Sequence, residues 1–170
     1  MGNLSFSMEP QDQDQWCWAA VAISICRFYK DRRWQHQCDL VNQILAPILG
    51  GIDCCQDGAS NTCNISFSLS DALNTTGHLA QRVQSVVSFE DLRQEIDVRQ
   101  RPVAIRIAFS DLITRHFIAV VGCAETPDGK QMVRVADPSP STGHAASIEY
   151  TSLLNDYRPG ATWDESYFST

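Results

Sequence analysis

The sequence predicts an α+β fold of two layers, in which helices come first and antiparallel strands second. Residues 16–29 are apolar nearly all round, which indicates a helix buried on most of its sides. From residue 103 onward the apolar spacing changes to the alternation that is typical of strands. Pro127-Asp128-Gly129 is a turn signal between two such segments, 116–121 and 132–136, so these are expected to form a hairpin.

Two long helices are expected in the first third of the chain. The apolar segment 16–29 ends in the polar residues 30–33, which mark the end of its helix. Apolar residues between 38 and 49 then recur at a helical spacing, although Pro47 is expected to kink or end this second element.

Two shorter helices follow. Ser70-Asp71 is expected to cap a helix that stops before Gly77. Ser88-Phe89-Glu90-Asp91 resembles a capping box, in which the side chains at the two ends of the motif bond each other's backbone. The helix that it begins should end near Arg99, because Pro102 follows.

The last third of the chain is predicted to be a sheet. Segments 103–109, 116–121 and 132–136 have the alternation or the apolar character of strands. Residues 148–150 are expected to add an edge strand, and residues 163–168 another. The helix of residues 16–29 would then pack on this antiparallel sheet.

Length and composition indicate one globular domain. The 170 residues are 44% hydrophobic and 19% charged. A chain of this size buries about two-thirds of its surface and can fold without staples. We expect a single domain over residues 1–170, with a helical lobe at about 11–100 and a β lobe at about 101–170.

Charge and hydropathy exclude several partners and locations. The net charge of −7 argues against nucleic acid or an anionic membrane as the main partner. No segment approaches the ~20 apolar residues that a membrane span needs. The first residues lack the basic and apolar regions of a signal peptide. The chain is therefore expected to stay in the cytosol, to be an excised domain, or to leave by a signal-independent route.

Cys17 lies where the polar loop of residues 11–15 becomes the first buried helix. The free N–H groups at a helix start, and the positive end of the helix dipole, favour a thiolate there. The alternative is that Cys17 is a small buried hydrophobic residue, as most cysteines are. Cys26 and Cys123 lie in apolar segments and are expected in the core.

Four of the seven cysteines form a cluster, Cys38, Cys54, Cys55 and Cys63. Two disulfides would use all four, in any of three pairings, and would require an oxidising compartment at some stage. The alternative is a zinc ion held by His36 and three of the cysteines. The adjacent pair Cys54-Cys55 fits poorly with zinc-ligand spacing, so disulfides are favoured and no metal is expected.

A nucleophilic cysteine needs a base, and the base needs an orienting group. Of the four histidines, only His116 opens an apolar strand. Asp137 ends the next strand, and an antiparallel hairpin brings its open ends together, so the two residues should be neighbours. Asp137 can then fix the imidazole tautomer. The alternatives are a half-buried polar histidine and an aspartate that only forms a turn before Pro138.

These residues together resemble papain-like cysteine proteases, particularly the short bacterial kind found among plant-pathogen avirulence effectors and bacteriocin-exporter peptidase domains. The resemblance covers residues 11–138 and rests on three motifs in the order of that family. The first motif is Gln15-Trp16-Cys17-Trp18-Ala19-Ala20, with Gln11 six residues before its cysteine. The second is His116-Phe117-Ile118-Ala119-Val120-Val121-Gly122, and the third is Val135-Ala136-Asp137-Pro138. Together they are fairly specific, whereas each alone is weak.

The resemblance implies a role for each matched residue. Cys17 would be the nucleophile, His116 the general base and then acid, and Asp137 the orienting residue. Gln11 would donate from its side chain to the oxyanion hole beside the Cys17 backbone N–H, and losing one such donor commonly costs ~10²–10³ in rate. The family's spacing selects Gln11 for this role over its rivals Gln13 and Gln15.

The sequence departs from papain in two places. Papain has Asn as its third residue and Gly-Ser before its cysteine, whereas this chain has Asp137 and Trp16. Both differences point to the shorter bacterial relatives. A Cys-Cys pair followed by Cys-Asn recurs in those relatives, as in Cys54-Cys55 and Cys63-Asn64 here, which also favours disulfides.

The expected function is therefore a papain-like cysteine endopeptidase, a thiol protease and hydrolase that needs no cofactor. By analogy it would be a bacterial effector or interbacterial toxin that cleaves a protein target and is secreted or delivered without a signal peptide. A possible immunity or inhibitor protein is a further partner. One alternative is a toxin of the transglutaminase or deamidase type with the same triad. The other is a non-catalytic binding module stapled by disulfides or zinc.

Overall fold

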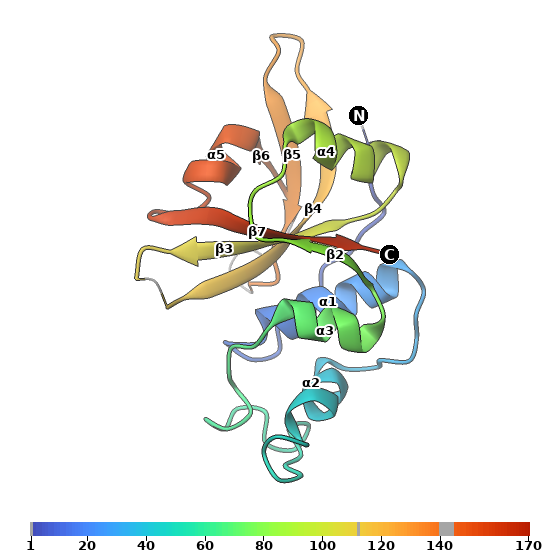
Figure 1. Cartoon of the computed structure of the whole chain (residues 1–170), viewed down its shortest axis with the longest axis vertical. Helices are drawn as coiled ribbons and strands as arrows, with labels where there is room; N and C mark the ends of the chain where they lie inside the picture. Colours follow the sequence, from blue (N-terminus) through green and yellow to red (C-terminus); the bar gives the residue numbers. More distant parts are fainter. Residues whose placement is uncertain (1, 112, 140–144) are drawn as a thin grey trace.

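The computed structural model describes residues 2–111, 113–139 and 145–170, which form an antiparallel sheet with helices on both faces (Figure 1). The helices are α1 (Cys17–Phe28), α2 (Gln37–Leu45), α3 (Leu69–Thr76), α4 (Phe89–Arg93) with its π-helical continuation η1 (Gln94–Val98), and α5 (Tyr150–Asn155). The strands are β1 (Gly2–Asn3), β2 (Leu79–Val83), β3 (Val103–Phe109), β4 (Arg115–Glu125), β5 (Gln131–Ala136), β6 (Ala146–Glu149) and β7 (Ala161–Ser169). The predicted α+β class is confirmed.

The strands follow the order β2-β7-β3-β4-β5-β6, and β1 pairs with β4. The predicted hairpin is confirmed as β4 and β5, with Ala119 opposite Ala136. β3 pairs with β4 only as far as Val120. Beyond that residue β1 pairs with the same side of β4, with Asn3 opposite Gly122. The N-terminal segment therefore pairs with β4 beyond the end of β3.

The prediction that residues 163–168 form an edge strand was wrong. β7 lies between β3 and β2, and β2 is the edge strand instead. β2 has mostly exposed side chains, so it lacks the apolar alternation by which a strand is recognised in a sequence. β6 is the other edge, as expected for residues 148–150.

Each face of the sheet has its own hydrophobic core. Helices α1, α2 and α3 cover one face, below the sheet in Figure 1, and α4, η1 and α5 cover the other. β4 is buried from His116 to Cys123, because Phe117 packs into the first core and its neighbour Ile118 into the second. A strand covered on both faces shows a continuous apolar run, as this one does.

One predicted helix boundary is confirmed and another changes. α2 ends at Leu45, two residues before Pro47, in agreement with the expected break. α3 begins earlier than predicted, since its cap is Ser68, whose side chain accepts from the backbone N–H of Asp71. Ser70 therefore lies inside the helix, and Gly77 ends it in the left-handed conformation (φ 80°) that glycine adopts without strain.

The capping box at Ser88 is confirmed. The Ser88 hydroxyl accepts from the N–H of Asp91, and the Asp91 carboxylate accepts from the N–H of Ser88. The helix widens into the π-helical turn η1 and stops before Arg99, as Pro102 predicted. Phe89, a residue of α4, packs in the core beside the sheet.

The predicted division into lobes is shifted by this packing. Residues 79–98 were assigned to the helical lobe, but β2 joins the sheet and α4 and η1 cover its second face. The cause is that β2 is too polar to read as a strand, and α4 turns its apolar side to the sheet rather than to α1. In the described part of the chain, no helix is both long and apolar enough to cross a membrane.

Candidate active site

Cys17 is the first residue of α1, directly after the N-cap Trp16. No side chain caps this helix end, and its described first turn contains no acidic residue. The first N–H bonded within the helix is that of Ala20, which donates to the carbonyl of Trp16 (2.9 Å). The N–H of Cys17 thus has no helical partner, and together with the helix dipole it favours negative charge at this point.

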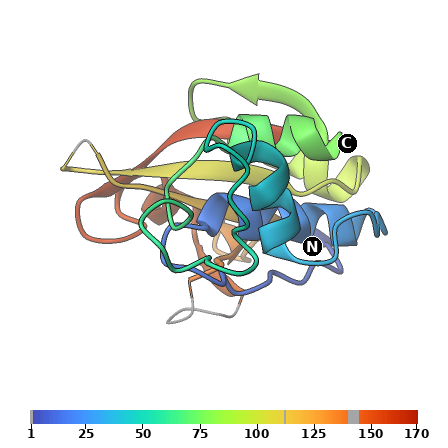
Figure 2. The same cartoon turned by 90° about the horizontal axis from the view of Figure 1, so that it is seen from below.

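The two tryptophans that flank Cys17 are buried and fixed to a distant segment. The indole N–H of Trp16 donates to the carbonyl of Cys63 (2.8 Å), and that of Trp18 donates to the carbonyl of Ile65 (3.1 Å). Figure 2 shows the loop that follows α2 beside the beginning of α1. This loop therefore sets the position of the cysteine between the tryptophans.

The loop itself is closed by two disulfides. Cys38 is bonded to Cys55, and Cys54 to Cys63, so the disulfide prediction is confirmed and one of three pairings is selected. All four sulfurs are consumed, and His36 instead begins α2, where its N–H donates to an Asp39 carboxylate oxygen (2.8 Å). The zinc alternative is therefore wrong for this cluster.

His116 and Asp137 are brought together by the hairpin of β4 and β5. His116 is the second residue of β4, and Asp137 directly follows Ala136, the last residue of β5. The His116 Nε2 atom lies 2.7 Å from Oδ1 of Asp137, and both side chains are largely buried. Because Nε2 is engaged in this way, Nδ1 is the nitrogen left for Cys17, which also forms a hydrogen bond with the ring.

This environment favours the imidazolium form of His116. Burial alone lowers the pKa of His116, but the hydrogen bonds with Asp137 and Cys17 outweigh it and raise the pKa to about 9. For the Asp137 carboxyl, burial acts in the opposite direction and raises the pKa. The hydrogen bond with His116 and the charge of the His116 ring outweigh burial and hold the pKa of Asp137 well below its usual range. The pair is therefore ionised at neutral pH.

Asp137 has three further donors that sequence reasoning missed. Its Oδ1 also accepts from the backbone N–H of Ser139 (2.8 Å). Its Oδ2 accepts from the Tyr157 hydroxyl (2.7 Å) and from the Arg158 guanidinium (2.7 Å). The only local signal in the sequence is a polar pair before the turn residues Pro159-Gly160, and such a pair is common in loops.

Gln11 lies close to Asp137 through its backbone. Its N–H donates to the carbonyl of Pro138, the residue after Asp137 (2.8 Å). Its side-chain Nε2 donates to the carbonyls of Gln13 (2.9 Å) and Asp14 (2.7 Å), which closes the loop before Cys17. The role of Gln11 in an oxyanion hole stays a prediction.

The other histidines and free cysteines lie apart from these residues. His36 begins α2, and the ring of His78 lies between Asp31 and the carbonyl of Thr170. His144 is outside the described residues. Cys26 and Cys123 are buried, as predicted, and burial raises the pKa of each thiol to about 12.

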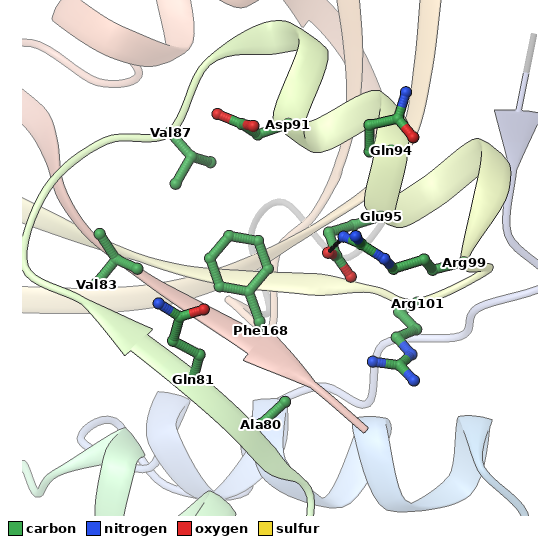
Figure 3. A pocket seen from close by; sticks show the side chains of 10 residues that line it. All are labelled: Ala80, Gln81, Val83, Val87, Asp91, Gln94, Glu95, Arg99, Arg101 and Phe168. Atoms are coloured by element: carbon green, nitrogen blue, oxygen red, sulfur yellow. Dashed lines mark hydrogen bonds and ion pairs between the residues drawn. The ribbon is translucent and has the colours of Figure 1, made fainter.

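A cavity of about 550 Å³ opens elsewhere, between β2, β7 and the helix formed by α4 and η1 (Figure 3). In Figure 3 the phenyl ring of Phe168 points into it, and Glu95 lies beside Arg99, with which it forms an ion pair. Its lining residues are Ala80, Gln81, Val83, Val87, Asp91, Gln94, Glu95, Arg99, Arg101 and Phe168. None of the residues around Cys17 or His116 belongs to it.

Comparison with known proteins finds one family match and a similar solved structure. The family model described as "Papain-like cysteine protease AvrRpt2" matches residues 2–155. A solved structure of the bromelain protease from Ananas comosus, in complex with the E64 inhibitor, is similar with a TM-score of 0.51 and 14% sequence identity. The match covers 98% of this chain and 94% of the bromelain chain, so the two share a fold. No curated protein matched the sequence.

Proposed function

Since this chain belongs to the family of the papain-like cysteine protease AvrRpt2, and is thereby a cysteine peptidase, we propose that it cuts the backbone of a protein target through a triad of Cys17, His116 and Asp137. The observation that carries the proposal is the buried hydrogen bond between His116 and Asp137. The His116 ring also forms a hydrogen bond with Cys17 at the start of α1. Nucleophile, base and orienting group thus form one connected chain of hydrogen bonds.

Acylation begins with the Cys17 thiolate attacking the carbonyl carbon of the substrate peptide. A sulfur–carbon bond forms, and the carbonyl electron pair moves onto oxygen, which would accept from the N–H of Cys17 and, once its side-chain amide releases the carbonyls of Gln13 and Asp14, from Gln11. His116, as the imidazolium, gives its Nδ1 proton to the amide nitrogen. The carbon–nitrogen bond breaks, the amine leaves, and a thioester remains on Cys17.

Deacylation runs through the same groups in reverse. Neutral His116 takes a proton from a water molecule, whose oxygen attacks the thioester carbon. The sulfur–carbon bond breaks, the acid leaves, and the thiolate and imidazolium are restored. Asp137 stays ionised throughout and holds the ring in the orientation that both steps require.

The proposal extends to biology as a secreted effector or interbacterial toxin. Two disulfides in the described chain support passage through an oxidising compartment, since such bonds rarely persist in a reducing cytosol. We expect a protein substrate and delivery without a signal peptide. An immunity or inhibitor protein would protect the producing cell.

The test is cleavage of a proteome-derived peptide mixture, read by mass spectrometry. The wild-type protein should generate new peptide ends, and Cys17→Ala and His116→Ala should each lose at least about 10³-fold of the rate. E64, the inhibitor present in the bromelain structure, is the probe for blocking Cys17. Cys26→Ala and His36→Ala are matched controls outside the site and should keep activity.

Three outcomes would contradict the proposal. Cleavage by folded Cys17→Ala would remove the nucleophile. A gain of about 1 Da or a crosslink on intact protein would indicate deamidation or transglutamination, which share the acyl-enzyme chemistry. No modification of any kind, with equal iodoacetamide labelling of Cys17 and Cys26, would favour the binding module, against the family membership.

A further inference from the structure

The carboxylate of Asp137 is held from two sides. On one side Oδ1 accepts from the ring of His116 and the N–H of Ser139, and on the other Oδ2 accepts from Tyr157 and Arg158, at 2.7–2.8 Å in every case. The Asp137 side chain is only 2% exposed. Each oxygen therefore has two donors, which fixes the plane of the carboxylate and leaves it no alternative orientation.

Tyr157 and Arg158, which donate to Oδ2 of Asp137, are consecutive residues of one connecting segment. They lie between α5 and β7, and Arg158 forms an isolated bridge with Ala161, the first residue of β7. The Arg158 guanidinium lies 5.7 Å from the centre of the Tyr157 ring, at cation–π distance. Both residues follow position 155, where the match to the family ends, so the family comparison assigns them no role.

The second cation changes the electrostatics of the triad. A buried carboxylate that faces only His116 would bind the imidazolium tightly and oppose the loss of its proton. An imidazolium stabilised in that way is a weak acid toward the leaving amine. The charge of Arg158, bonded to the opposite oxygen, offsets part of the Asp137 charge that His116 senses.

We propose that Arg158, supported by Tyr157, is a positioning residue of this protease that fixes the Asp137 carboxylate and, through its charge, keeps the His116 imidazolium able to release its proton. The inference rests on the proposed triad. Cys17 from α1 and Asp137 after β5 are the titratable groups that form hydrogen bonds with the His116 ring in the described chain. Tyr157 and Arg158 reach the ring only through Asp137.

The test separates position from charge with three substitutions. Arg158→Gln removes both the charge and the guanidinium hydrogen bond, so kcat should fall about tenfold or more with KM nearly unchanged, and the alkaline limb of kcat/KM should move up by about one pH unit. Arg158→Lys keeps the charge but loses the planar guanidinium, so its limb should stay at the wild-type pH while kcat falls less. Tyr157→Phe keeps the charge and loses one bond.

Arg93→Gln is the matched control, because Arg93 is a half-exposed arginine on α4 that pairs with Glu90 and Asp97. Its pH profile should equal that of the wild type. A wild-type limb and kcat in folded Arg158→Gln would overturn the inference. If Arg158→Gln does not fold, wild-type kcat in both Arg158→Lys and Tyr157→Phe overturns it instead. Activity in Cys17→Ala would overturn the triad itself, so the two failures are distinguishable.

Discussion

At the scale of single residues, the chemistry of His116 depends on which neighbours it keeps. Desolvation opposes its positive charge, whereas Asp137 and Cys17 favour it, and the balance raises its pKa to about 9. In the proposed mechanism the protonated ring is the general acid of acylation, so the pH at which it loses its proton should limit activity.

This balance predicts the pH profile of the wild-type enzyme. kcat/KM should fall as the pH rises through about 9, because the imidazolium then loses its proton. Asp137→Asn removes a negative partner of the ring, so the limb should move to lower pH and kcat should decrease. Profiles from pH 5 to 10 measure both effects. Asp31→Asn, at the Asp31–His78 pair, is the control and should leave the limb in place. An unmoved limb in Asp137→Asn would exclude Asp137 as the partner that sets it.

The places of Cys17, His116 and Asp137 at element boundaries, and the contact between the last two, could be predicted from the sequence because local patterns reveal each boundary. The loop-to-helix change marks Cys17, and strand length plus the turn at Gly129 brings His116 to Asp137. Tyr157 and Arg158 could not be predicted, because their partner is 20 or 21 residues away across a segment without periodicity. Long-range partners of this kind leave no trace in spacing.

At the scale of elements, the loop between α2 and α3 supports the start of α1. Its carbonyls at Cys63 and Ile65 accept the indole N–H groups on either side of Cys17. The disulfide between Cys54 and Cys63 includes the residue whose carbonyl accepts from Trp16. The disulfide between Cys38 and Cys55 connects the loop to α2 instead. The disulfide of Cys54 and Cys63 is therefore more directly connected to the segment around Cys17 than the disulfide of Cys38 and Cys55 is.

The double variants Cys54→Ser/Cys63→Ser and Cys38→Ser/Cys55→Ser should accordingly differ. Each loses one bridge and should lose about 2–4 kcal/mol of unfolding free energy, measured with urea. Only the first pair should also lower kcat, because it loosens the segment that fixes Trp16 and Trp18. Equal kcat in both folded variants would show that the loop does not position Cys17.

Some element boundaries are set by neighbouring residues in the sequence, whereas the order of the outer strands is set by distant residues. The capping box at Ser88 and the glycine stop at Gly77 are local, and the structure confirms both. β2 and the interior place of β7 are not local, since a polar strand is fixed only by the partner that it meets. Sequence alone therefore predicted the class of the fold and the hairpin, but not the order of the outer strands.

At the scale of the whole molecule, buried ionised groups link stability to pH. Hydrogen bonds and ion pairs hold the pKa of Asp31, Asp137 and Glu165 below the usual range, although burial opposes the shift of all three. A lowered carboxyl pKa stabilises the fold above the unfolded value near 4, and this stability is lost as the pH falls. The raised pKa of His116 stabilises the fold below about 6.5.

The free energy of unfolding should therefore be highest at about pH 5–6.5, between these two limits. It should decrease below pH 4 as the carboxylates take up protons. It should also decrease between about pH 6.5 and 9, as the contribution of His116 is lost. Urea titrations at each pH test this, and in His116→Ala the alkaline decrease should become shallower. An unchanged slope in that variant would assign the decrease to other groups.

The place of β7 in the sheet has a consequence for the time at which activity appears. β2 and β3 are bridged by β7, which is synthesised after both of them, and Arg158 precedes β7 directly. A nascent chain therefore carries Cys17 long before the groups that would activate it can assemble. A ribosome-bound chain is in this sense still inactive, and remains so until its last strand enters the sheet.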